Sequence, residues 1–149
     1  MHTINNALAS SNTETQHLLH LACATALQAG SLIKQQYAQP HDIRKKGTIN
    51  LVTETDLAAE ALIVECLRQK TPYIPIMAEE SPKTLNLRGQ PLYWVVDPLD
   101  GTTNFAHGIP HFAVSIALFE HEQPKVAAIY HPMLDELFCA ITAAGPRQA

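Results

Sequence analysis

The first part of the chain carries apolar residues at the spacing of helices. Between residues 14 and 38 they recur about every 3.6 positions, which predicts a long amphipathic helix that ends before Pro40. Its apolar face comprises Leu18, Leu21, Ala22, Ala29, Leu32 and Ile33. A second run predicts a helix from about Thr55 to Lys70. Its apolar positions are Leu57, Ala61, Leu62, Val64 and Leu67.

The later part of the chain has the pattern of strands. Residues 73–77, which follow Pro72 and include Pro75, predict a short strand at a sheet edge. Apolar runs at 113–119, 125–130 and 137–141, joined by short turns, predict an antiparallel meander. Because the helices come first and the strands follow, we expect an α+β fold with long helices packed on a mostly antiparallel sheet.

A basic segment separates the two predicted helices. Three adjacent basic residues occupy positions 44–46. Two interpretations of residues 42–56 remain open, a short solvated hairpin and a role near an anionic ligand. Thr53 and Asp56 have the spacing of a capping box, so the second helix is expected to start here.

Composition limits the class of protein. A chain of 149 residues fits one domain, and 46% hydrophobic with 16% charged residues excludes wholesale disorder. The net charge of -4 provides no basic face, so we expect no direct binding to nucleic acid or membrane. No apolar run has the length of a membrane span. We expect residues 1–13 to form a flexible start and residues 142–149 an irregular tail.

The cysteines and the start of the chain indicate a compartment. Cys23, Cys66 and Cys139 lie in apolar segments without a C-x-x-C pair, which favours free thiols in a reducing environment. Residues 1–16 are polar and do not resemble a signal peptide. A cytoplasmic location is therefore expected.

Acidic and hydroxyl side chains gather after the most apolar strand. The run 94–96 stops at Asp97, and Asp100 follows Pro98, where we expect the strand to end in a turn. A Gly-Thr-Thr sequence comes next. Carboxylate oxygens beside a hydroxyl and free backbone N–H groups suit Mg²⁺ and a phosphate. The alternative is an ordinary Asp-Pro turn with both acids solvated.

Other predicted elements also end in carboxylates. Glu79 follows the short strand, and Asp56 marks the predicted helix start. Since neighbours on a strand face opposite ways, only one of Glu79 and Glu80 can point into a site. Glu79 and Asp56, together with Asp97 and Asp100, would make a site for two divalent ions. Such a site binds the attacking and the leaving oxygen of a phosphoryl transfer.

Three segments of this chain read KKGTINLVTETD, IMAEES and WVVDPLDGTTNFAHGIPHFAVSI. In this order they resemble the K-x₄-D-L-V-T-x-x-D segment, the I-G-E-E-S strand end and the first signature of the inositol monophosphatase family. The resemblance covers about residues 14–141, but only the N-terminal half of the family's fold. It implies an αβαβα layered sandwich, Mg²⁺-dependent hydrolysis of phosphomonoesters and inhibition by lithium.

The resemblance also implies roles for individual residues. Glu79, Asp97 and Asp100 would bind Mg²⁺, joined by the backbone carbonyl of Leu99. The metals would lower the pKa of the attacking water and neutralise charge on the phosphoryl oxygens.

Catalysis and substrate binding would fall to neighbours of these ligands. Thr102, assisted by Glu79, would activate the water, and Asp56 would support Thr102 or a further metal. Gly101 and Thr102 would offer backbone N–H groups to the phosphate at a helix start. Asp100 completes the expected substrate-binding set.

The residues after this core suggest a substrate. Thr103-Asn104-Phe105 looks like the branch that acts on inositol monophosphate or a related small sugar phosphate. Relatives acting on 3'(2'),5'-bisphosphate nucleotides tend to carry Lys-Glu-Phe there, and histidinol-phosphate phosphatases an Arg, and both remain alternatives. His107 and His111 match no family ligand and are expected to be structural.

Several positions depart from the family. Asn50 replaces its usual Asp, and Ala78 its usual Gly. The W-D-x-A-A motif of the second half is absent, since Trp94 is the only tryptophan. We therefore expect a shortened chain without one metal ligand and without most substrate selectivity. The family implies a homodimer, and some bacterial relatives act through protein partners in the transcription machinery. A non-catalytic fragment or protein-binding module is thus the alternative to an active phosphatase.

Overall fold

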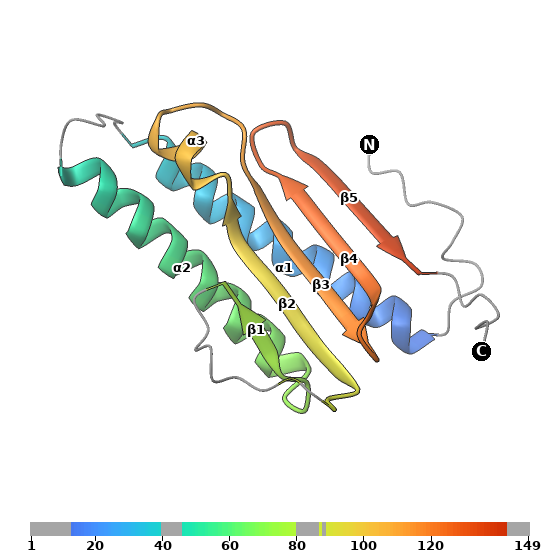
Figure 1. The fold of residues 1–149 in the computed structure, drawn as a ribbon. Coiled ribbons are helices and arrows are strands. Elements are labelled where there is room, and N and C mark those ends of the chain that lie inside the picture. Colours follow the sequence, from blue (N-terminus) through green and yellow to red (C-terminus); the bar gives the residue numbers. More distant parts are fainter. Residues whose placement is uncertain (1–12, 40–45, 80–86, 88, 143–149) are drawn as a thin grey trace.

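The computed structural model describes residues 13–39, 46–79, 87 and 89–142. Two long helices pack against one side of a sheet of five strands (Figure 1). The α+β prediction is confirmed. The predicted flexible start, irregular tail and basic residues at 44 and 45 lie outside the described residues, apart from Thr13 and Thr142 at their borders.

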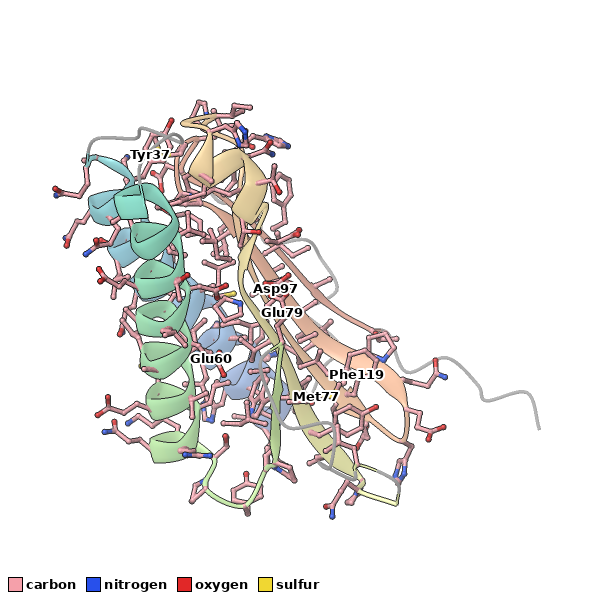
Figure 2. The ribbon with its side chains drawn as sticks, turned by 60° about the vertical axis from the view of Figure 1, so that its left-hand side comes forward. Tyr37, Glu60, Met77, Glu79, Asp97 and Phe119 are labelled. Carbon is pink, nitrogen blue, oxygen red and sulfur yellow. The ribbon has the colours of Figure 1, made fainter. Side chains whose placement is uncertain are left out.

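Helix α1 runs from Thr13 to Tyr37, close to the predicted bounds, and crosses β3, β4 and β5. Helix α2 runs from Lys46 to Lys70 and packs on α1 and β2. Figure 2 shows both helices on the same side of the sheet. They share a core with the sheet because the apolar stripe of each helix faces it.

The start of α2 corrects two predictions. Residues 46–56 are helical, so the hairpin is wrong, and Thr53 and Asp56 lie inside the helix rather than at its cap. The apolar stripe explains this difference. Partly buried Val52 lies three residues before buried Thr55, and the buried positions Ala59, Ile63 and Leu67 continue the stripe. The stripe therefore begins before the polar sequence that resembled a cap.

The sheet has the order β1-β2-β3-β4-β5. Strand β1 (Ile76–Ala78) begins three residues later than predicted, but it lies at the sheet edge as predicted and runs parallel to β2 (Leu92–Asp100). Strands β3 (Ala113–Glu120), β4 (Gln123–His131) and β5 (Glu136–Ile141) follow in antiparallel pairs, which confirms the meander.

Strand β2 does not end at Asp97 as predicted, but continues through Pro98 to Asp100. One extra residue bulges out between Asp97 and Asp100 in the pairing with β3. Strand β1 pairs with β2 only as far as Val96. At Pro98, β2 thus lacks a β1 partner, and a proline without an N–H is tolerated there.

The two faces of the sheet differ in burial. Trp94, Ile116 and Val126 on the helix side are fully or almost fully buried. On the opposite side Ile129 and Phe138 pair across β4 and β5, and they are 44% and 59% exposed. In the described part of the chain, no helix has the length and apolar character needed to cross a membrane.

Candidate active site

The carboxylates of Glu79 and Asp97 lie side by side because of the register of two parallel strands. Ala78 of β1 pairs with Val96 of β2, and each acid is the next residue along its strand. In a parallel pair, residues in register point to the same side of the sheet. The two side chains are in hydrogen-bond contact and lie together in Figure 2. The structure therefore brings together two acids that are 18 residues apart in the sequence.

This contact concentrates negative charge. Burial, the nearby charge and hydrogen bond of Glu79, and the charge of Asp100 raise the pKa of Asp97 to about 6. The backbone N–H of Leu99, which donates to Asp97 Oδ1 at 3.3 Å, acts in the opposite direction. A divalent cation would relieve this repulsion.

The donor chemistry fits Mg²⁺, because the clustered groups are hard carboxylate oxygens. Within residues 13–39, 46–79, 87 and 89–142, however, no three or more His, Cys, Asp or Glu side chains form a group that could hold a metal ion. Glu79 and Asp97 are in contact, and Asp100 acts on Asp97 through its charge. Glu80 lies outside the described residues. The ligand roles of these acids and of the Leu99 carbonyl stay predictions.

Beyond Asp100 the chain makes a left-handed turn into a short helix. Gly101 has φ 95° and ψ 38°, and α3 runs from Thr102 to Ala106. A Cβ atom on Gly101 would lie 3.0 Å from the backbone oxygen of His111 and 3.3 Å from Phe112. Both the backbone conformation and this close approach favour glycine. The first N–H groups of α3 have no acceptor within the helix, as at any helix start.

A loop from α3 to β3 packs over this turn. The Asn104 side-chain amide donates to the backbone oxygen of His111 at 2.9 Å. The Ile109 N–H donates to the backbone oxygen of Asn104 at 2.8 Å. From the end of α1, the Tyr37 hydroxyl donates to the Gly108 oxygen at 2.6 Å. The loop that covers the turn after Asp100 is thus fixed by hydrogen bonds within itself and to the end of α1.

An aromatic cluster supports the same loop. The ring centroid of Tyr37 lies 5.7 Å from that of Phe105 and 5.2 Å from that of Phe112. The centroids of the two phenylalanine rings lie 5.3 Å apart. Tyr37 was not among the residues predicted for the site, because its only signal in the sequence is its place at the end of an amphipathic helix.

Asp56 lies in the interior of helix α2. It is half-buried on α2, with a buried Oδ1 atom, and α2 packs against both β2 and α3. One helical turn further, Glu60 also buries a carboxylate oxygen. Glu60 was not among the predicted residues, although its spacing of four residues from Asp56 places both on one side of a helix.

Comparison with known proteins identifies the fold and its relatives. Residues 14–147 match the sequence profile of the inositol monophosphatase family. The chain is 43% identical over 130 residues to Nus factor SuhB of Escherichia coli, covering 86% of this chain and 48% of that protein. It is 39% identical over 137 residues to inositol monophosphatase 3 of Solanum lycopersicum, covering 90% of this chain and 51% of that one.

Solved structures agree with these matches. The suhB protein of Bartonella henselae superimposes with a TM-score of 0.74 at 34% identity, covering 87% of this chain and 50% of that chain. CysQ of Bacteroides thetaiotaomicron gives a TM-score of 0.77 at 34% identity, covering 90% and 49%. This chain spans about half the length of each of these relatives. With a profile match over most of its length and the same fold, the chain belongs to the inositol monophosphatase family.

Proposed function

We propose that this chain carries the metal- and phosphate-binding part of a Mg²⁺-dependent phosphatase for inositol monophosphate or a related small sugar phosphate. The observation that carries this proposal is the contact between Glu79 and Asp97, followed within a few residues by the left-handed turn at Gly101. A concentrated negative charge beside a backbone turn suits a cation and a phosphate bound together.

The proposed roles follow from these positions. Glu79, Asp97, Asp100 and the Leu99 carbonyl would hold Mg²⁺, which would supply charge neutralisation and a more acidic water. Thr102 begins α3, where its hydroxyl, with Glu79 as proton acceptor, would orient the attacking water. The N–H groups of Gly101 and Thr102 would bind phosphate oxygens.

Asn104 and Phe105 belong to the segment that suggested an inositol phosphate substrate. Asn104 donates to the loop at His111, and Phe105 is fully buried in the aromatic cluster. We infer that these residues influence the substrate by shaping the loop rather than by touching it. A panel of inositol monophosphate, a 3'(2'),5'-bisphosphate nucleotide and histidinol phosphate distinguishes the substrate classes.

The test measures phosphate release from inositol-1-phosphate by the purified 149-residue chain, with and without Mg²⁺. Asp100→Asn removes one charge from the cluster, at an exposed position. Glu65→Gln is the matched control, because it removes one charge at an exposed position on α2 that is not part of the cluster. We expect release that needs Mg²⁺, falls at least about 100-fold in Asp100→Asn and persists in Glu65→Gln. No release from folded wild-type protein would contradict catalysis by this chain.

A second candidate function is that of a protein-binding module in the transcription machinery. It is favoured by the 43% identity to a relative named Nus factor SuhB. This function predicts that the chain binds purified RNA polymerase or an associated factor in a direct binding assay, and that Asp100→Asn binds equally well. Binding that needs the intact carboxylates would instead link it to the metal site.

A further inference from the structure

His131, the last residue of β4, has a ring whose hydrogen bonds fix its tautomer. It is 9% exposed, and the backbone N–H of Leu134 donates to its Nδ1 at 3.4 Å. A ring nitrogen that accepts carries no proton, so in the neutral ring the proton sits on Nε2. This Nε2 lies 3.2 Å from Nδ1 of His111. His131 is therefore the donor and His111 the acceptor.

His111 connects this bond to the candidate active site. Its ring is exposed and meets the His131 ring edge to face, with centroids 5.2 Å apart. Its backbone oxygen accepts from Asn104 of α3 and packs against Gly101, where there is no room for a Cβ atom. A shift of His111 would therefore move the atoms that cover the left-handed turn.

The contact between His131 and His111 joins the loop from α3 to β3 to a different element. Within the loop, the His111 N–H donates to Ile109 and the Ile109 N–H donates to Asn104, so these bonds move with the loop. His131 belongs instead to β4, which is paired on both sides by β3 and β5. His131 ties the loop to the end of β4, as Tyr37 ties it to α1.

We propose that His131 is a positioning residue for the turn at Gly101 and Thr102. Through its bond to His111 it holds the loop that packs on Gly101, and so sets the direction of the N–H groups at the start of α3. The ligand of these groups rests on the proposed function, whereas the coupling between His131 and Gly101 does not. None of the residues in this contact is a predicted metal ligand.

Two substitutions at His131 separate its hydrogen bonds from its volume. His131→Phe keeps a buried ring without nitrogen atoms, and His131→Gln keeps an amide that can donate to His111. Tyr130→Phe is the matched control, because it removes a hydrogen bond from the neighbouring residue of the same strand, to Asp135. His111→Phe tests the same bond from its exposed side, where packing tolerates the change.

The first readout is the amide NMR spectrum of Gly101 and Thr102, which needs no catalysis. We expect both signals to shift in His131→Phe and in His111→Phe, to return toward wild type in His131→Gln and to stay unchanged in Tyr130→Phe. Unchanged signals in the two ring variants would overturn the proposal.

The second readout is phosphate release. Because small displacements of positioned groups are costly to catalysis, we expect kcat to fall about 10-fold in His131→Phe with a smaller change in KM, and His131→Gln to recover most of the loss. An unchanged kcat in His131→Phe would overturn the positioning role while leaving the phosphatase intact. If the two ring variants shift the amide signals but the wild-type chain releases no phosphate, the coupling is upheld and the proposed function is rejected.

Discussion

A Cβ atom on Gly30 would overlap Cδ1 and Cε1 of the Tyr130 ring. Helix α1 therefore crosses β4 so closely that the Tyr130 ring occupies the space of a side chain. The ring is held from its other end, because its hydroxyl donates to Asp135 Oδ1 at 2.9 Å. This contact fixes how near the helix lies to the sheet.

Gly30→Ala tests this contact. In an open helix interior this change stabilises by about 1 kcal/mol, but overpacking against an anchored ring costs about 1–3 kcal/mol. We expect a net loss of up to about 2 kcal/mol in the free energy of unfolding, measured by urea denaturation. In a Tyr130→Ala background the same substitution should become neutral or stabilising. A stabilised single variant would show that the helix has room to shift.

Tyr130 also predicts a pH dependence. Burial, followed by the hydrogen bond and charge of Asp135, raises the pKa of Tyr130 above its ordinary value. Above pH of about 10 the unfolded chain loses this proton while the folded chain keeps it, so the contribution to stability falls as pH rises. Compared with Tyr130→Phe, wild type should lose unfolding free energy as the pH rises above about 10, the ordinary pKa of tyrosine. Parallel curves for the two proteins would contradict the raised pKa.

Much of the fold could be predicted because its elements bury one regular face. The α1 stripe and the alternating strands β3 to β5 have clear periods, and their bounds agree with the structure to within about two residues. The early start of α2 and the passage of β2 through Pro98 were not predicted. Both depend on what lies beside the element in space, the core for Val52 and the absence of a β1 partner for Pro98.

The acids of the candidate site could be selected from motifs, but not their contacts. Glu79 meets Asp97 only through the register of β1 and β2, which pattern alone does not determine. The bond from Tyr37 to Gly108 joins residues 71 positions apart, and that from His131 to His111 joins residues 20 apart. Such contacts arise when α1 and β4 pack around the loop, and no local sequence pattern encodes them.

Asp97→Asn should change stability in opposite ways without and with Mg²⁺. Removing one charge relieves repulsion from Glu79 and Asp100, so we expect the metal-free protein to gain up to about 1 kcal/mol, since solvent partly screens this half-buried group. Mg²⁺ should raise the unfolding temperature of wild type but not of the variant. Differential scanning calorimetry with and without Mg²⁺ measures both effects, with Glu65→Gln as the control. An equal response of Asp97→Asn to Mg²⁺ would remove Asp97 from the proposed ligands.

Two isoleucines on neighbouring strands test the difference between the faces of the sheet. Ile116 of β3 is 0% exposed beneath the helices, whereas Ile129 of β4 is 44% exposed and pairs with the exposed Phe138. Ile116→Ala should cost about 2–5 kcal/mol, because it leaves a cavity in a packed core. Ile129→Ala should cost less than about 1 kcal/mol, because water already reaches its side chain. Urea denaturation at several protein concentrations measures both, and the low concentrations report on the isolated chain. Equal losses at low concentration would mean that the outer face is covered in the isolated chain, contrary to the exposure seen here.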